Sequence, residues 1–238
     1  MFSNKLRQKR LIRSHKILSN RKILDELILD VAIPIIKEQK KEFSKVCIIS
    51  DNSKIIIDNK FFNSYDLNIL SLNKFLETNN KDYDLVLGLS CINFTNKIEN
   101  DLKKIKSMMG QDSFLLCAYF SDNNLCEFKK IMQSSEISLF DGISQRFHPI
   151  VDIRDIGNLF NQTGFINSVI QREKFMIEYN SFKEFITHLR KMAITNIFSD
   201  QDNFPIGKKF FFNILNMFND IKGNKITYEV LIATAWRQ

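Results

Sequence analysis

Two apolar stretches decide the fold of this chain: YDLVLGLS at residues 83–90 and DSFLLCAYF at residues 112–120. Each is a continuous apolar run of strand length between polar residues, and the helical segment KIENDLKKIKSMM at residues 97–109 separates them. Strands that are apolar on both faces and alternate with helices form parallel sheets that are covered on both sides. The two stretches therefore predict a doubly wound α/β fold.

The alternation of strands and helices continues on both sides of this pair. Upstream, the pattern predicts a helix at residues 22–40 and strands at 46–50, 54–57 and 67–70. Downstream, it predicts a helix at 151–165, a long strand or strand pair at 166–180, helices at 181–193 and 208–219, and a last strand at 225–238. Gly164 stands where a helix ends in left-handed geometry. We expect a Gly-Asn turn at residues 223–224 to join the last pair of strands and to give a mostly parallel sheet an antiparallel edge.

Composition favours one globular core. The chain has 238 residues, is 44% hydrophobic and contains 22 Phe, which is enough for one sizeable domain. We expect this domain at residues 23–238, after a basic helix at residues 1–22. No apolar run approaches the roughly 18 residues that a membrane helix needs. The four cysteines are far apart and three lie in or beside apolar runs, so we expect neither a metal site nor a disulfide, and a reducing compartment.

The N-terminal arm carries much of the net charge of +7. Residues 4–22 are dense in Lys and Arg and contain no acid, and apolar residues recur among them at near-helical spacing. Four interpretations stay open: a mitochondrial targeting peptide, a nucleic-acid contact, a contact with an anionic membrane surface, and a solvated helix that leads into the domain. The absence of interleaved aromatic residues weakens the nucleic-acid interpretation. We expect a retained helix that packs on the domain.

Several phrases resemble a known family, the class I S-adenosylmethionine-dependent methyltransferases. Within this superfamily the chain is most similar to the family of the mitochondrial complex I assembly factor and its alphaproteobacterial relatives. The phrases are FSNKLRQKRLIRS, DYDLVLGLSCINF, GISQRFHPIVDIRDIGNLFNQTGF, LRKMAITN and TYEVLIATAW. The last three resemble the family's G-x-S-x-R-x-x-P-F-x-D-x-R-D-x-G, L-R-x-M-G-x-T-N and T-F-E-I-I-x-x-x-G-W. This resemblance implies a Rossmann-like fold and S-adenosylmethionine as the cofactor.

The cofactor positions of that family have changed in this chain. The loop after the first strand is glycine-rich in the family, because residues without Cβ let the backbone approach the cofactor. Here the corresponding residues contain no glycine, and the other expected contacts have also changed. The degenerate cofactor positions are Ser50, Asp51, Asn52, Ser71 and Ser90. The family's His-Trp pair is replaced by Ile92-Asn93 or Asn93-Phe94, and Asp58 comes too early to hold the ribose hydroxyl groups.

Spacing also argues against a complete pocket. Only 33 residues, 51–83, lie between the first strand and the DLVLGL strand. Three crossovers and two intervening strands need roughly 40 to 46 residues. We therefore expect a shortened N-terminal half and no bound cofactor. S-adenosylmethionine is the expected cofactor if the pocket is retained.

The SQRFHPIVDIRD stretch is the predicted contact site for a partner or substrate. It holds Arg146, His148, Asp152 and Arg154 at the mouth of a predicted helix. Asp152 is alternatively an N-cap of that helix, and His148 is alternatively a packed or solvated residue. No spacing of His, Cys and acidic residues suggests a metal site.

These observations favour a degenerate methyltransferase-fold protein that binds a protein partner in respiratory complex I assembly. One alternative is an active S-adenosylmethionine-dependent methyltransferase or arginine hydroxylase that acts on a protein side chain. The other is a nucleic-acid-binding module that uses the basic N-terminus. We expect the bacterial cytoplasm as its location, or the mitochondrial matrix if the source is eukaryotic.

Overall fold

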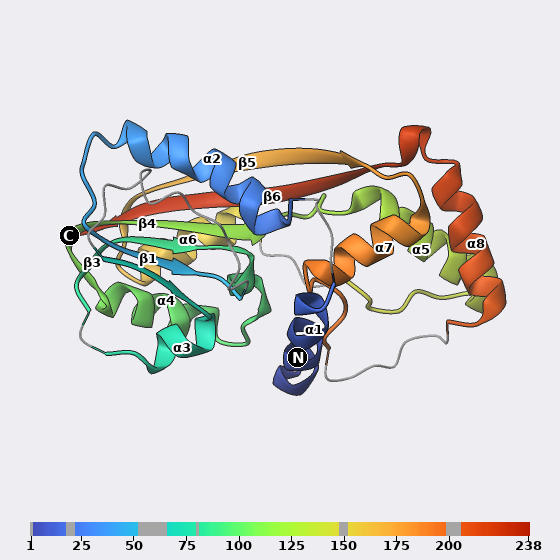
Figure 1. Ribbon diagram of the computed structural model, residues 1–238, viewed down its shortest axis with the longest axis horizontal. Coiled ribbons are helices and arrows are strands. Elements are labelled where there is room, and N and C mark those ends of the chain that lie inside the picture. The colour runs from blue at the N-terminus through green and yellow to red at the C-terminus, as the bar shows by residue number, and fades with distance from the viewer. Residues whose placement is uncertain (1, 18–21, 52–65, 80, 148–151, 199–205) are drawn as a thin grey trace. The chain divides into compact units, whose positions relative to one another are not determined.

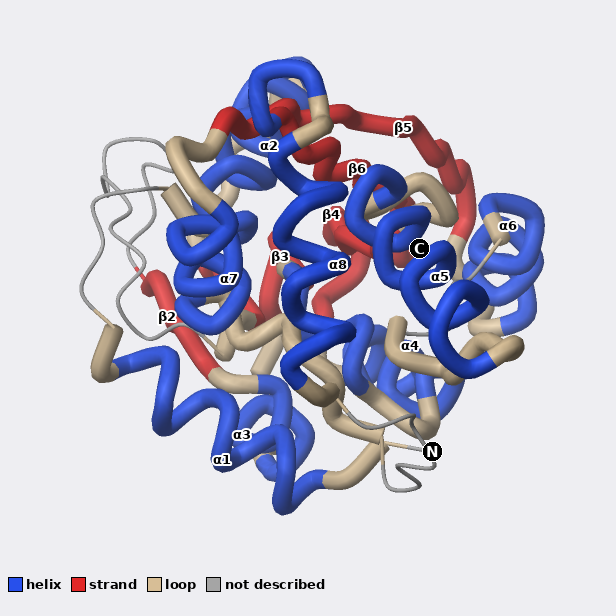
Figure 2. Tube along the Cα trace, turned by 90° about the vertical axis from the view of Figure 1, so that its right-hand side faces the viewer, coloured by secondary structure: helices blue, strands red, loops and turns tan. Residues whose placement is uncertain are grey.

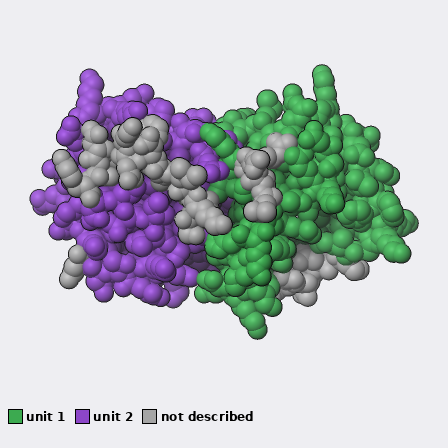
Figure 3. All heavy atoms as spheres, viewed as in Figure 1, with its two compact units in different colours: residues 1–23, 122–150, 174–229 green, residues 24–121, 151–173, 230–238 purple. Residues whose placement is uncertain are grey.

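The computed structural model describes residues 2–17, 22–51, 66–79, 81–147, 152–198 and 206–238. The chain forms two compact units (Figure 3). Unit 1 consists of residues 1–23, 122–150 and 174–229, and unit 2 consists of residues 24–121, 151–173 and 230–238. Two of the borders fall inside long strands of the sheet, so each unit is built from segments that are distant in sequence.

The described strands form one six-stranded sheet in the order β2-β1-β3-β4-β6-β5. The strands are β1 (Lys45–Ile49), β2 (Asp66–Leu70), β3 (Tyr83–Gly88), β4 (Met109–Phe120), β5 (Ile166–Glu178) and β6 (Lys225–Arg237). β1 pairs in parallel with β2 and β3, and β3 pairs in parallel with β4. β6 is antiparallel to β4, with Phe120 opposite Val230. The predicted doubly wound, mostly parallel sheet with an antiparallel C-terminal edge is confirmed.

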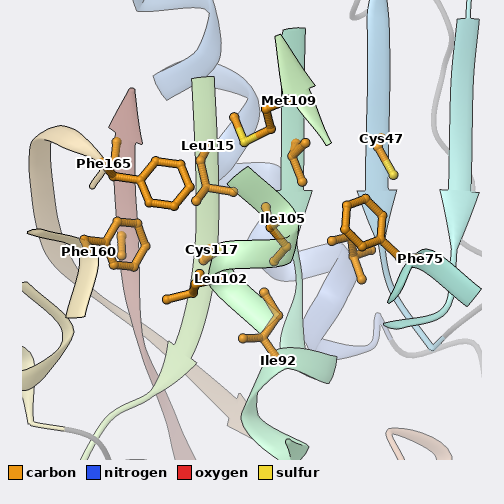
Figure 4. Close-up of a cluster of buried hydrophobic side chains, with 14 of the residues drawn as sticks. Cys47, Phe75, Ile92, Leu102, Ile105, Met109, Leu115, Cys117, Phe160 and Phe165 are labelled. Carbon is orange, nitrogen blue, oxygen red and sulfur yellow. The ribbon is translucent and has the colours of Figure 1, made fainter. Parts of the chain in front are cut away.

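Helices cover both faces of the sheet in unit 2. Figure 1 shows α2 (Leu24–Glu38) on one side of the strands, and α3 (Leu72–Glu77) and α4 (Ile98–Ser107) on the other. The second face also receives α6 (Ile153–Gln162), whose Phe160 ring lies 5.6 Å from the Phe165 ring. Figure 4 shows these two rings near Leu115 of β4, with Leu102 and Ile105 of α4 in the same cluster. Burial on both faces explains why the strands read as continuous apolar runs.

Unit 1 is helical and aromatic. Its helices are α1 (Asn4–His15), α5 (Cys126–Phe140), α7 (Phe182–Lys191) and α8 (Lys208–Asn219). α5 packs against α8, as Figures 1 and 2 both show, and α1 packs against α7. The Phe185 ring at the centre lies 4.9 Å from Phe128, 5.2 Å from Tyr179 and 5.4 Å from Phe218. Many of the chain's phenylalanines therefore serve as core residues.

The structure corrects several predicted elements. α1 ends at His15, short of residue 22, and residues 166–178 form one strand. The short α3 and the helix α5, whose buried face is interrupted by Ser135 and Glu136, were not predicted. The prediction that Gly223 and Asn224 join the last two strands is wrong, because they connect α8 to β6 and two helices separate β5 from β6. The predicted strand at 54–57 and Asp58 lie outside the described residues.

The described part of the N-terminal half has few elements between its first strands. Between β1 and β3 in sequence, the described residues contain one strand and one helix, β2 and α3. Residues 52–65 of this interval lie outside the described part, so the expected shortening stays a prediction. The predicted single domain after residue 22 stays a prediction, although α1 packs inside unit 1. Within the described part of the chain, no helix has the length and apolar character needed to cross a bilayer.

Candidate functional site

The sheet order places a candidate site at the ends of β1 and β3. From β1 the chain passes to β2 on one side of β1, and β3 lies on the other side, so the direction of winding reverses between β1 and β3. Ligands of doubly wound folds bind outside the carboxyl ends of the strands at such a point. The residues that follow these ends are Ser50 and Asp51 after β1, and Leu89 with the 3-10 helix Ser90–Phe94 after β3.

Asp25, from the first turn of α2, connects the two strand ends. The Ser50 hydroxyl donates a 2.5 Å hydrogen bond to Asp25 Oδ2. The Ser90 hydroxyl donates to Asp25 Oδ1, and the Ser90 amide donates to the same oxygen at 3.2 Å. Asp25, Ser50 and Ser90 are 4%, 2% and 9% exposed. The carboxyl group therefore fastens the end of β1 to the end of β3.

Among the described residues, the groups that set the ionisation of this carboxyl include no cation. Burial raises the pKa of Asp25, the hydrogen bonds from Ser50 and Ser90 lower it in part, and Asp51 raises it further. The net effect is a pKa above the usual range of aspartate. Hydroxyl dipoles offset only part of the cost of removing a carboxylate from water. Asp25 therefore holds its proton to a higher pH than an exposed aspartate does.

The segment after β3 is occupied by structural contacts. A Cβ atom on Gly88 would lie 1.9 Å from Cδ1 of Ile92 and 3.0 Å from Sγ of Cys117, so a larger residue here would displace the Ile92 side chain. The Asn93 side chain donates to the Ser90 carbonyl at 2.8 Å and the Ala118 carbonyl at 3.3 Å, and it accepts from the Phe120 amide at 2.6 Å. Asn93, at a position where the resemblance suggested a changed cofactor contact, therefore ties this segment to β4.

The structure brings two of the five predicted cofactor positions together. Ser50 and Ser90 share Asp25, and Asp51 follows directly and is half-buried. Ser71 is the N-cap of α3, where its hydroxyl accepts from the Lys74 amide at 3.4 Å. Asn52 lies outside the described residues.

Sequence reasoning missed Asp25, the residue that organises this site. Its signal was available: it is an acid next to Leu24 and one turn before the apolar Ile28 and Leu29, on the face that α2 buries. An acid on the buried face of a helix needs a polar partner. The sequence alone gave no means of identifying that partner.

Arg146, one of the residues predicted to contact a partner, lies within unit 1. Its Nε donates a 2.6 Å hydrogen bond to Glu136, and its guanidinium lies 5.2 Å from the centre of the Phe210 ring. The Ser144 amide donates to the same Glu136 carboxylate at 3.0 Å, and the Ser144 hydroxyl also donates to it. Arg146 therefore has a structural contact inside its own unit.

The other predicted contact residues belong to the start of α6 or are not described. Asp152 is the N-cap of α6, and its side chain accepts from the Arg154 amide at 2.8 Å, as the alternative interpretation predicted. Arg154 is exposed. His148 lies outside the described residues. In the part of the chain that the structure describes, no group of three or more His, Cys, Asp or Glu residues is arranged to hold a metal ion.

Comparison with curated proteins connects this geometry to known families. No protein-family model matches the chain. It is 24% identical over 130 residues to "Arginine-hydroxylase NDUFAF5, mitochondrial" of Mus musculus, a match that covers 55% of this chain and 38% of that protein. RP459 of Rickettsia prowazekii, whose name places it among methyltransferases, is 21% identical over 178 residues, or 73% of this chain and 76% of RP459.

Solved structures agree on the fold. YcgJ of Bacillus subtilis superposes with a TM-score of 0.51 at 7% identity, over 88% of this chain and 99% of YcgJ. The 1,6-didemethyltoxoflavin-N1-methyltransferase of Burkholderia thailandensis, solved with S-adenosylhomocysteine, superposes with a TM-score of 0.50 at 11% identity, over 98% of this chain and 87% of that one. The chain has the class I methyltransferase fold and is related to NDUFAF5. It spans less than half the length of the NDUFAF5 proteins that it matches.

The class I methyltransferase fold makes S-adenosylmethionine a possible cofactor, so the fit of the described residues matters. Such a ligand needs polar groups of the strand ends to be directed toward it. The hydroxyls of Ser50 and Ser90 instead donate to Asp25, and the Asn93 side chain accepts from an amide of β4. In this arrangement the side chains of Ser50, Ser90 and Asn93 are engaged within the chain and are not directed at a cofactor. Residues 52–65, which follow β1, lie outside the described part.

Proposed function

We propose that this chain is a degenerate methyltransferase-fold protein that acts by binding a protein partner, in respiratory complex I assembly, without using S-adenosylmethionine. The observation that carries the proposal is the buried hydrogen-bonded group of Asp25, Ser50 and Ser90 between the ends of β1 and β3. It lies at the carboxyl ends of β1 and β3, where doubly wound folds bind their ligands. The glycine-free sequence after β1 supports the same conclusion.

The free-energy cost of breaking these hydrogen bonds explains why the group disfavours ligand binding. To turn toward a cofactor, Ser50 and Ser90 would have to release a carboxyl that is 4% exposed. A buried polar group that loses its partner costs about 1–3 kcal/mol. Breaking three such hydrogen bonds removes several kcal/mol from any cofactor affinity, unless the ligand replaces each bond.

The test is calorimetric titration with S-adenosylmethionine and with S-adenosylhomocysteine. We expect no binding at ligand concentrations up to about 1 mM. A dissociation constant of that size corresponds to a binding free energy of only about −4 kcal/mol. A dissociation constant in the low micromolar range for either compound would contradict the proposal.

Arg146, His148, Asp152 and Arg154 are the proposed contacts to the protein partner. Arg154 is the sharpest probe, because its side chain is exposed while Asp152 caps a helix and Arg146 binds Glu136. A guanidinium makes paired hydrogen bonds to a carboxylate, which lysine does not reproduce. Arg154→Lys should therefore leave the melting temperature unchanged and weaken capture of the partner, or genetic complementation, about tenfold. Full complementation by this variant places the contact elsewhere.

The second candidate function is an enzyme that modifies a protein side chain, as an S-adenosylmethionine-dependent methyltransferase or as an arginine hydroxylase. Two observations favour it: the fold is shared with a methyltransferase solved with S-adenosylhomocysteine, and NDUFAF5 is named an arginine hydroxylase. Mass spectrometry of candidate substrate proteins after incubation separates the two functions. A gain of one methyl group or one oxygen atom that depends on this chain supports the enzyme.

A further inference from the structure

Unit 1 concentrates three arginines where α1 meets the end of α7. Arg10 and Arg13 lie one turn apart on α1, and Nη2 of Arg13 donates a 3.0 Å hydrogen bond to the hydroxyl of Thr195. Thr195 follows α7, whose last turn carries Arg190. Because α1 packs against α7, the three guanidinium groups share one neighbourhood.

The donors of this cluster are not satisfied. Nε of Arg10 and Nε of Arg13 are buried and have no hydrogen-bond acceptor among the described residues. In the same part of the chain, no carboxylate forms an ion pair with Arg10, Arg13 or Arg190. Burial, then Arg10 and then Arg190 lower the pKa of Arg13, as expected for like charges held close together.

A neighbouring arginine shows what a structural role looks like on the same helix. Arg7 is 9% exposed, and its Nη1 donates a 2.7 Å hydrogen bond to the carbonyl of Ala193. Its charge is directed at a backbone acceptor of unit 1. Among the described residues, Arg10 and Arg190 have no hydrogen-bond acceptor of this kind, so contacts within the described part of unit 1 do not account for their charges.

We propose that Arg10, Arg13 and Arg190 form a binding site for a phosphate-type oxyanion. A phosphate group carries up to two negative charges and offers several acceptor oxygens, which suits converging guanidinium forks better than the two oxygens of a carboxylate. A bound dianion also offsets the mutual repulsion of the three cations. Exposed Lys5, Lys9 and Lys16 on α1 add a positive field that attracts anions to this face.

Arg190→Gln is the decisive variant, because Arg190 is exposed and its removal leaves the Arg13 contact with Thr195 intact. Thermal unfolding is followed with inorganic phosphate or pyrophosphate, against sodium chloride at equal ionic strength. The wild-type melting temperature should rise by about 3–6 °C once the free anion exceeds its dissociation constant about tenfold. Arg190→Gln should weaken anion binding about tenfold. Without the anion it should melt about 1 °C higher than wild type, because one repulsion is relieved.

Two further variants keep the result interpretable. Lys208→Gln combined with Lys209→Gln removes two positive charges from α8 in the same unit and should leave anion binding unchanged. Arg13→Gln should lose anion binding, although it also loses the contact with Thr195. If phosphate stabilises wild type no more than chloride does, or if Arg190→Gln responds like wild type, the proposal is overturned.

A final comparison identifies the source of the phosphate. Binding of the protein to vesicles of phosphatidylglycerol in phosphatidylcholine is compared with its binding to vesicles of phosphatidylcholine alone. Soluble pyrophosphate is then added to compete with the vesicles. Binding of pyrophosphate that depends on the arginines supports a soluble ligand. Binding of only the anionic vesicles, with the same dependence, supports a lipid headgroup. Binding of neither overturns the site.

Discussion

The two units each bury a carboxyl group, and they stabilise it by different means. Asp25 of unit 2 is 4% exposed, and Glu136 of unit 1 is 1% exposed. Asp25 accepts hydrogen bonds from two hydroxyls and, at 3.2 Å, from one amide, and burial raises its pKa above the usual range. Burial also raises the pKa of Glu136, but the donors of Ser144 and the guanidinium of Arg146 outweigh it, and the net pKa is lowered.

The comparison shows that burial alone does not set the charge of an acid. A guanidinium in hydrogen-bond contact favours the ionised form, whereas hydroxyl dipoles offset only part of the desolvation cost. Glu136 is therefore a charged anchor for the segment around Arg146. Asp25 instead holds its proton more tightly and joins the ends of β1 and β3 through neutral donors. The two carboxyl groups therefore differ in charge state because they differ in their donors, and not because one is more buried than the other.

The largest expected effect comes from breaking the ion pair of unit 1. Arg146→Met leaves Glu136 buried without its cation, so the free energy of unfolding should fall by about 3–5 kcal/mol in urea denaturation. The double variant Arg146→Met with Glu136→Gln removes the stranded charge and should recover much of this loss. If the single variant costs less than about 1 kcal/mol, Glu136 is not a charged anchor and the comparison fails.

Replacing Asp25 tests the other side of the comparison. Asp25→Ala removes the acceptor of two buried hydrogen bonds, from the hydroxyls of Ser50 and Ser90, at a cost of about 1–3 kcal/mol for each bond removed. Asp25→Asn keeps a carbonyl oxygen and adds an amide donor, so at low pH it should cost no more than about 1 kcal/mol.

The pH dependence distinguishes the two acids by sign. The pKa of Asp25 is raised on folding, so its contribution to stability is full below the usual aspartate pKa and is lost as the pH rises through the raised value. Asp25→Asn should therefore gain on wild type as the pH rises. The pKa of Glu136 is lowered, so its contribution is lost as the pH falls, and Glu136→Gln should gain on wild type in acid. Parallel pH profiles for both variants would remove the distinction.

Glu127 tests whether a cation is needed to lower the pKa of a partly buried carboxyl group. Burial raises its pKa, but the hydroxyl of Thr227 at 2.6 Å and its amide at 2.9 Å, together with the amide of Glu127 itself and the Cys126 thiol, outweigh burial and lower the pKa without any arginine among the described residues. Thr227→Val should cost about 1.5 kcal/mol in urea denaturation, because one charge-assisted hydrogen bond is lost. Thr187→Val is the matched control, since that hydroxyl bonds to a carbonyl of its own helix. Equal losses in the two variants would mean that the charge of Glu127 adds nothing.

The smallest expected effect concerns two helix ends, one in each unit. α6 of unit 2 ends with Gly164 at φ +79°, whereas α7 of unit 1 ends with Ala193 at φ +55°. The left-handed region costs an L-residue roughly 1–2 kcal/mol, of which glycine's greater freedom in the unfolded chain cancels part. Ala193→Gly should therefore raise the free energy of unfolding by about 0.5–1 kcal/mol, and Gly164→Ala should lower it by a similar amount. A destabilising Ala193→Gly would show that the alanine methyl packs favourably there.

The sequence by itself determined the α/β class, the parallel strands, the antiparallel last strand and most helices. These features depend on local apolar periodicity and on strand length, which are written along the chain. Asp152 as an N-cap and Gly164 as a helix end were equally readable, because caps depend on residues within one turn. The short α3 and the serine-interrupted α5 were missed because their patterns are weak.

Only the tertiary structure decided which polar groups meet. Asp25 is 25 residues from Ser50 and 65 from Ser90, and Arg13 is 182 residues from Thr195. No local pattern encodes such pairs, because they depend on which strand ends become neighbours in the sheet and which helices pack together. The sequence showed that no glycine follows β1 at the place where the methyltransferase family has a glycine-rich loop. The structure added that a buried acid now joins the two strand ends, since a carboxyl group removed from water takes the donors that the fold brings within reach.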